Sequence, residues 1–86
     1  MFVIVTYDIS SKRVGKVMKI CRKYLTHVQK SVFEGLITPG KLSQLKREIS
    51  EIIDVEEDRV RIYKLDSLKY TSKEEIGIHD IEDNIF

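Results

Sequence analysis

The sequence lacks the features that identify several large classes of protein. It has one cysteine, one proline and no tryptophan among its 86 residues. A single cysteine excludes a disulfide framework and a cysteine-based zinc site within one chain. No apolar run approaches the ~20 residues of a membrane-spanning helix. The N-terminal segment has no basic region before its apolar run and no small-residue cleavage site after it. We therefore expect no signal peptide, no membrane partner and a cytoplasmic protein.

The motifs of several common enzyme classes are also absent. The chain has no G-x-S-x-G, P-loop, G-x-G-x-x-G or H-E-x-x-H pattern. It also lacks the aromatic motif of RRM domains. The sequence therefore gives no support for acyl transfer, for nucleotide binding by a glycine-rich loop or for zinc peptidase chemistry.

Length and composition predict one small globular domain. Hydrophobic residues make up 42% of the chain and charged residues 34%, which is typical of a folded protein rather than a disordered tail. A second core would need ~100 more residues. Because a chain this short buries only about 60% of its unfolded surface, dimerisation would add to its stability.

The net charge of +1 hides an uneven distribution of charge. Between Ile9 and Phe33 there is no acidic residue, but there are seven basic ones: Lys12, Arg13, Lys16, Lys19, Arg22, Lys23 and Lys30. This run predicts a surface that faces an anion, and nucleic acid is the commonest large anion in a cytoplasm. A plain solvated helix face is the alternative that the same pattern fits.

Hydrophobic periodicity predicts a strand and then a helix in the first third of the chain. β-branched and aromatic residues fill positions 2–7, which indicates a central strand. Ser10 and Ser11 offer an N-cap for the helix. Apolar residues then recur at helical spacing, opposite the basic residues: Val14, Val17, Met18, Cys21 and Leu25.

The middle of the chain predicts β structure and a second helix. Residues 27–37 form either one bent strand or a hairpin that turns near Lys30 and Ser31. Thr38 caps the second helix, with Pro39 at its first position. The apolar stripe of this helix consists of Leu42, Leu45, Ile49, Ile52 and Ile53. Residues 59–65 alternate between polar and apolar, which indicates a half-buried strand.

These elements predict an α+β fold. With a hairpin in the middle, the order is βαββαβ, a ferredoxin-like domain over residues 1–65 with an antiparallel sheet and two helices on one face. The other face is then bare, which predicts a homodimer. Residues 66–86 are polar and acidic but carry spaced isoleucines. That pattern favours an extra C-terminal strand added to a neighbouring sheet edge.

Asp8 is the strongest candidate for a catalytic or metal-binding residue. It follows the predicted central strand and precedes the basic helix. A carboxylate there suits Mg²⁺, which takes one or two carboxylates together with waters and phosphates. Two copies of Asp8 near a twofold axis could share one ion. The alternative is an aspartate that only caps the helix or ends the strand.

Two signatures together resemble the CRISPR-associated protein 2 family. One is Tyr-Asp-Ile at 7–9, and the other is Val-Gln-Lys-Ser-Val-Phe-Glu-Gly at 28–35. The basic helix between them and the strand Arg-Val-Arg-Ile-Tyr at 59–63 extend the similarity over nearly the whole chain.

The resemblance implies a homodimer with its sheets face to face and a C-terminal strand added to the partner subunit's sheet. It implies one Mg²⁺ per dimer, held by Asp8 from each subunit. The reaction it implies is phosphodiester hydrolysis of single-stranded RNA or double-stranded DNA, with metal-bound water attacking phosphorus. It also implies spacer acquisition with the CRISPR-associated integrase, CRISPR-associated protein 1.

The family's site residues carry over by position. Asp8 matches the metal ligand, Tyr7 a catalytic tyrosine and Phe33 a supporting phenylalanine. Together with the basic run, the resemblance predicts a nucleic-acid-binding set: Lys12, Arg13, Lys16, Lys19, Lys23, His27 and Lys30. The chain departs from the family at Val14 and His27, where arginine is frequent. Both changes could lower nuclease activity without disturbing fold or dimer.

Three functions follow from these expectations. The first is a Mg²⁺-dependent endonuclease that acts through Asp8. The second is a scaffold without catalysis that bridges the integrase on DNA. The third, outside the family, is a ferredoxin-like regulatory dimer that binds a small ligand, and the basic helix argues against it.

Overall fold

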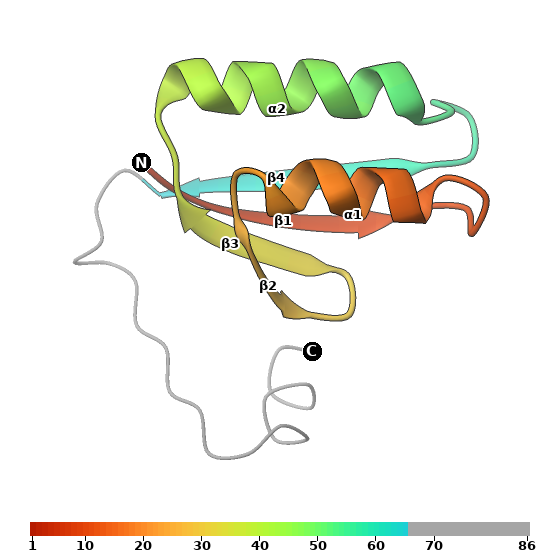
Figure 1. The fold of residues 1–86 in the computed structure, drawn as a ribbon, viewed down its shortest axis with the longest axis horizontal. Helices are drawn as coiled ribbons and strands as arrows, with labels where there is room; N and C mark the ends of the chain where they lie inside the picture. Colours follow the sequence, from red (N-terminus) through yellow and green to blue (C-terminus); the bar gives the residue numbers. More distant parts are fainter. Residues whose placement is uncertain (66–86) are drawn as a thin grey trace.

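The computed structural model describes residues 1–65, which form an antiparallel sheet of four strands and two helices. In chain order the elements are β1 (Phe2–Asp8), α1 (Val14–Arg22), β2 (Thr26–Gln29), β3 (Val32–Leu36), α2 (Pro39–Ile52) and β4 (Arg59–Leu65). The strand order is β2-β3-β1-β4 (Figure 1). The predicted ferredoxin-like fold and the central position of the first strand are confirmed. The predicted C-terminal strand, at residues 66–86, lies outside the described residues.

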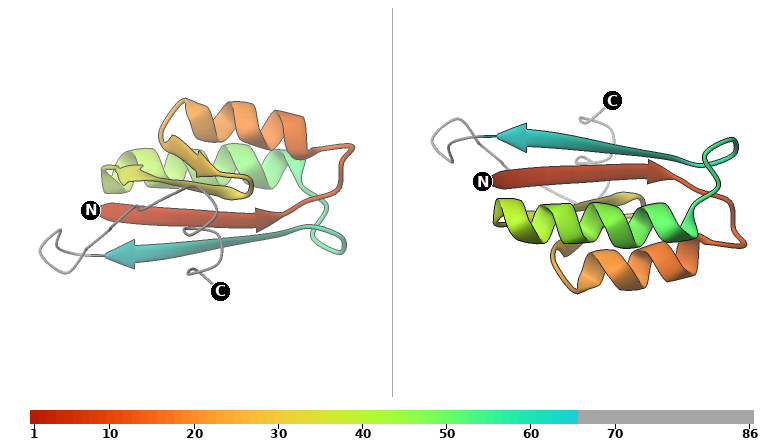
Figure 2. Two further views of the ribbon diagram at one scale, coloured as in Figure 1. Left: turned by 90° about the horizontal axis from the view of Figure 1, so that it is seen from below. Right: turned by 90° about the horizontal axis from the view of Figure 1, so that it is seen from above.

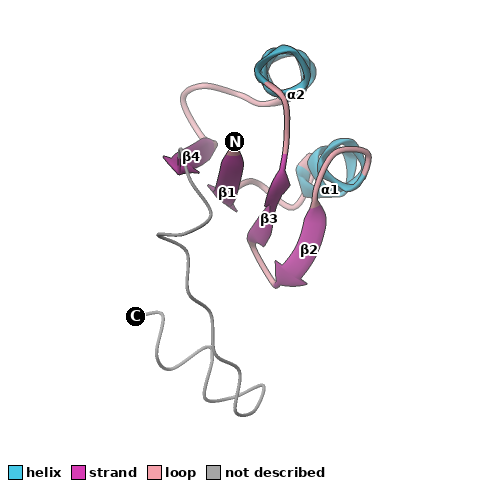
Figure 3. Ribbon diagram, turned by 90° about the vertical axis from the view of Figure 1, so that its left-hand side faces the viewer, coloured by secondary structure: helices cyan, strands magenta, loops and turns pink. Residues whose placement is uncertain are grey.

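Both helices cover the same face of the sheet, as the end-on view shows (Figure 3). They run side by side along the strands (Figure 2). The core forms between this face and the helices, and its fully buried side chains are Val3, Val5, Val17, Cys21, Phe33 and Leu45. The single cysteine is thus a core residue, and its burial raises the pKa of the thiol to about 11. Neither helix in residues 1–65 is long and apolar enough to cross a membrane.

The middle β segment is a hairpin. Strands β2 and β3 pair in antiparallel register and turn at Lys30 and Ser31. The backbone N–H of Tyr7 donates to the Ser31 carbonyl at 3.2 Å, which fixes the turn against the end of β1. Between the two alternatives for residues 27–37, the hairpin is therefore confirmed and the single bent strand is wrong.

The start of α2 matches the prediction. The Thr38 side chain accepts a hydrogen bond from the Lys41 N–H at 3.2 Å, and Pro39 occupies the first helical position. Proline is tolerated there because the N–H it lacks has no partner within the helix.

The start of α1 differs from the prediction. The helix begins at Val14, and its N-cap residue Arg13 makes no capping side-chain bond. The Ser10 hydroxyl instead accepts from the Lys12 N–H at 3.3 Å. The predicted N-cap at Ser10 and Ser11 is therefore wrong, because this serine organises a turn that precedes the helix.

Phe33 links the sheet to the helical layer. It is fully buried, its ring stacks on His27 at a centroid distance of 4.5 Å, and the Tyr7 ring lies 6.1 Å away.

We predict that Phe33→Ala lowers the free energy of unfolding by about 3–5 kcal/mol, because it leaves a cavity in the core. The measurement is urea unfolding. Val55→Ala is the control, since Val55 is 84% exposed, and it should change stability by less than about 0.5 kcal/mol. Equal effects of the two substitutions would contradict this account of the core.

Candidate metal and nucleic-acid site

The sheet face opposite the helices, which we call the open face, carries Asp8. Alternate residues of a strand point to opposite faces, and along β1 Val3, Val5 and Tyr7 are buried on the helical side. Asp8 and Thr6 therefore belong to the open face, where Asp8 is exposed. Within residues 1–65, no element covers this face.

The open face divides into a mainly apolar half, in which Glu34 opposite Ile4 is the charged residue, and a charged half. In the apolar half, Phe2 lies between Leu36 and Leu65 in the sheet register, and Ile4 lies opposite Tyr63. Exposed fractions of 63% for Leu36 and 51% for Tyr63 are high for large apolar side chains. In the charged half, Asp8 lies opposite Arg59, and Thr6 lies opposite Arg61.

The charged half is hollowed. A cleft of about 250 Å³ is lined by Thr6, Tyr7, Asp8, Arg59 and Arg61. Figure 1 shows that β1 ends and β4 begins at the same end of the sheet. Asp8 is the last residue of β1 and Arg59 the first of β4, so the cleft that they line lies at this end. Among the described residues, no hydrogen bond or ion pair engages the side chains of Asp8, Arg59 or Arg61.

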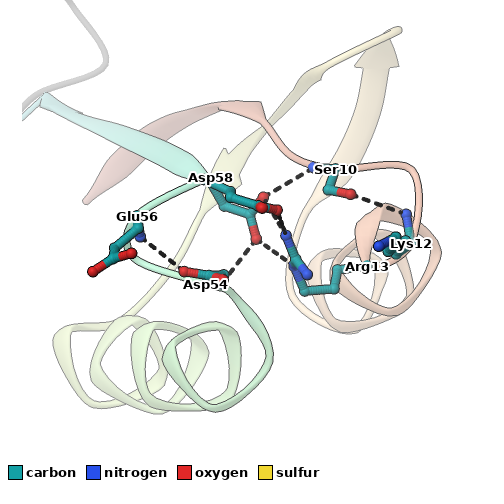
Figure 4. A network of polar contacts seen from close by, with 7 residues as sticks. Ser10, Lys12, Arg13, Asp54, Glu56 and Asp58 are labelled. Carbon is teal, nitrogen blue, oxygen red and sulfur yellow. Dashed lines mark hydrogen bonds and ion pairs between the residues drawn. The ribbon is translucent and has the colours of Figure 1, made fainter.

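The loops beside this cleft are held together by Asp58 (Figure 4). Its carboxylate accepts from the Ser10 N–H at 2.9 Å and the Asp54 N–H at 2.9 Å. It also accepts from Arg13, at 2.6 Å from Nε and 3.2 Å from Nη2. Ser10 follows Asp8 by two residues, and Asp58 immediately precedes Arg59. The network therefore fixes the two strand ends that form the cleft.

The network also sets the protonation of its members. The hydrogen bonds from Arg13 hold the pKa of Asp58 well below its usual range, although burial of the carboxylate opposes the shift. Arg13 also donates to Glu57 at 2.8 Å, and these bonds raise its own pKa. Asp58 is thus a fully buried, charged acceptor whose charge is balanced by Arg13.

Asp8 fits a magnesium ion in chemistry but supplies only one ligand. Its carboxylate is a hard oxygen donor, exposed and without a hydrogen-bond partner among residues 1–65. No group of three or more His, Cys, Asp or Glu side chains is placed to hold a metal in this part of the chain. Arg59 and Arg61 line the same cleft, and their charge disfavours a cation. A metal here therefore needs a further negative ligand, such as a second Asp8 or a phosphate.

Tyr7 and Phe33, the other two predicted site residues, are buried in the core. The Tyr7 ring is buried in the core, which raises the pKa of its hydroxyl. That hydroxyl donates to the Lys30 carbonyl at 3.2 Å. Tyr7 borders the cleft as a neighbour of Asp8, but its hydroxyl is hydrogen-bonded to the hairpin turn. The predicted catalytic tyrosine thus has a structural contact in place of one with Asp8.

The seven predicted nucleic-acid contacts fall into three groups. Lys12, Lys16, Lys19 and Lys30 are exposed and form no ion pair with a described residue. Arg13 is held by Asp58 and Glu57, and Lys23 is paired with Glu48, which also accepts from Tyr24. His27 is exposed and stacked on Phe33. The four free lysines are therefore the ones available to phosphates.

The comparisons with known proteins agree with one another. Residues 1–73 match the family model of CRISPR associated protein Cas2. The CRISPR-associated endoribonuclease Cas2 of Thermotoga maritima is 51% identical over 83 residues, which cover 96% of this chain and 95% of that one. The CRISPR-associated endonuclease Cas2 of Halalkalibacterium halodurans is 40% identical and covers 96% of each chain. The crystal structure of Streptococcus pyogenes Cas2 superposes with a TM-score of 0.73 at 34% identity, covering 87% of this chain and 100% of that one.

The Asp58 network predicts a specific pH dependence of stability. The pKa of Asp58 is lowered in the folded state, so its contribution is complete above the ordinary aspartate pKa of about 3.9 and is lost as the pH falls toward the folded value. We predict that Asp58→Asn lowers the thermal midpoint by several degrees at pH 7, and that the difference from wild type shrinks below about pH 4. Calorimetry over this pH range is the measurement. Glu57→Gln is the control, since the Glu57 side chain is 63% exposed, and it should have a much smaller effect. A pH-independent difference would argue against a charged Asp58.

Proposed function

The chain belongs to the CRISPR-associated Cas2 family, and from this premise we propose that it is a metal-dependent endonuclease of CRISPR spacer acquisition that works as a homodimer. The observation that carries the proposal is the Asp8 carboxylate in the cleft of the charged half, which forms no hydrogen bond or ion pair with any residue of 1–65. The Thermotoga maritima relative is named an endoribonuclease and the Halalkalibacterium halodurans relative an endonuclease. Both names fit cleavage of a phosphodiester bond.

The proposed reaction is hydrolysis. Water adds to phosphorus, one P–O ester bond breaks, and the leaving oxygen gains a proton. When bound, Mg²⁺ would activate water and offset the charge that develops on the phosphate. The residue that would hold it is Asp8, with the second carboxylate supplied by Asp8 of a second copy. The role of the chain is to present this carboxylate at the rigid end of β1, beside the loop that Asp58 fixes.

The homodimer rests on the apolar half of the open face. An antiparallel sheet face that meets water is ordinarily polar, yet this half exposes Leu36 and Tyr63. A second copy packed on this face would bury the apolar side chains. A twofold axis near the charged half would bring the two copies of Asp8 together.

The exposed lysines of α1 support the proposed role in spacer acquisition. Lys16 and Lys19 are exposed on this helix, on the side of the sheet opposite Asp8, so they can bind phosphates at a distance from the cleft. A dimer then presents two such basic helices. This arrangement suits a bridge between nucleic acid and the CRISPR-associated integrase, and such bridging needs no catalysis by Asp8.

We predict that Asp8→Ala lowers Mg²⁺-dependent cleavage of single-stranded RNA or duplex DNA by more than about 100-fold. Asp8 would be a direct ligand, and the loss of an outer-shell partner alone costs up to about 100-fold. EDTA should have the same effect on the wild type, because both treatments remove the metal. The measurement is gel-resolved cleavage with and without Mg²⁺.

Lys64→Gln is the control for this experiment. Lys64 is exposed on β4 opposite Val3, on the side of the sheet away from Asp8, so cleavage should be unchanged. Cleavage that survives in Asp8→Ala would refute the metal site. If the wild type supports spacer integration without cleaving, and Asp8→Ala does the same, the chain is the scaffold and not the nuclease.

We predict that Leu36→Lys combined with Tyr63→Lys converts the dimer into a monomer, because two charges would be buried in the apolar half of the interface. Sedimentation equilibrium gives the mass in solution. Val55→Lys adds a charge at an exposed site outside the sheet and should leave the mass unchanged. A doubly substituted chain that sediments with the wild-type dimer mass would show that another surface forms the interface.

A further inference from the structure

Two arginines share the Asp8 cleft, and neither belongs to the basic run of the sequence. Arg59 is the register partner of Asp8, and Arg61 that of Thr6, so all four residues lie on one face of neighbouring strands. Directly opposite residues of an antiparallel pair have Cβ atoms about 5 Å apart, and diagonal ones about 7–8 Å. Both guanidinium groups can therefore reach a ligand that also meets Asp8.

No residue in the described part of the chain forms a hydrogen bond or ion pair with either guanidinium group. Elsewhere in the described chain, acids and bases that meet form direct pairs, such as Arg13 with Asp58 at 2.6 Å. In the cleft, no ion pair joins Asp8 to Arg59 or Arg61 within residues 1–65. Arg59 and Arg61 are exposed, and each presents a planar fork of N–H donors that matches two oxygens of a phosphate.

The charge balance of the cleft favours an anionic ligand. Asp8 alone would repel a nucleic-acid phosphate, and a second copy of Asp8 would double that repulsion. Two arginines reverse the sign, because two positive charges and one negative charge leave a net +1 per chain in the cleft. A cleft of about 250 Å³ has room for a phosphodiester group and ordered water.

We propose that Arg59 and Arg61 form a phosphate-binding site that holds a backbone phosphodiester of RNA or DNA beside the Asp8 carboxylate. The site deepens the proposed function and rests on it for the identity of the ligand. The bound phosphate supplies negative charge next to Asp8, which also offsets the arginines and makes the cleft more favourable for a cation. Phosphate and metal therefore bind with positive coupling.

The test uses the full chain and two readouts, and the first is binding in EDTA. Arg59→Gln combined with Arg61→Gln should weaken binding of single-stranded RNA or of duplex DNA about tenfold or more at low salt. For duplex DNA, the slope of log affinity against log salt should also become shallower by about 0.9 for each phosphate that the variant no longer neutralises. Lys64→Gln removes one charge from the same strand on the opposite side of the sheet and should change binding less. Arg59→Lys combined with Arg61→Lys keeps both positive charges and removes the planar forks of N–H donors. The affinity of this variant for nucleic acid should therefore lie between those of the wild type and the glutamine variant.

The second readout separates this site from the proposed nuclease. Asp8→Ala should bind nucleic acid at least as tightly as wild type, because it removes a negative charge, while its cleavage is abolished. If wild type binds through the arginines but never cleaves, the phosphate site stands and the nuclease proposal fails. Unchanged affinity and slope in the glutamine variant, or an equal loss of affinity in Lys64→Gln, would overturn the site. Dissociation of the dimer by the glutamine variant, with unchanged affinity per chain, would instead make the arginines interface residues and also overturn it.

Discussion

The fully buried carboxylate of Asp58 joins parts of the chain that are far apart in sequence. It accepts hydrogen bonds from Ser10 and Arg13 on one side and from Asp54 on the other. Leaving such a group without partners would be costly, so the loop after β1 and the turn before β4 are held in one arrangement. The two strand ends that border the cleft, at Asp8 and Arg59, depend on this arrangement for their relative position.

The same network separates structural charges from available ones. Asp58 and Arg13 neutralise each other inside the loop layer, and Lys23 and Glu48 do so between the helices. The charged half of the open face contains no such pairing among residues 1–65, although acid and base are register neighbours there. In a protein with a net charge of only +1, this division leaves a small number of groups free to bind an anion. It concentrates them at one end of the sheet and on the outer face of α1.

Local sequence patterns predict the helices and strands well, but they do not predict the network of charged groups around Asp58. The alternation in residues 59–65 and the Thr38-Pro39 start of α2 match the structure because each depends on neighbours within one element. In the sequence Asp58 ends the acidic stretch 54–58, and no local pattern identifies its partner Arg13, which is 45 residues away. Arg59 and Arg61 could be recognised as neighbours of Asp8 only once the strand order placed β4 beside β1. The distant bond to Asp58 also removes Arg13 from the residues free to bind phosphate.

We propose that metal and phosphate bind together in the charged half of the open face. The most direct measurement is paramagnetic broadening of backbone amide resonances by substoichiometric Mn²⁺, with a short single-stranded RNA present. The account predicts that the amides around Asp8 and Arg59 broaden first, and that Asp8→Ala removes the effect. Broadening centred instead on the acidic turn at 54–57, or unchanged by Asp8→Ala, would contradict it.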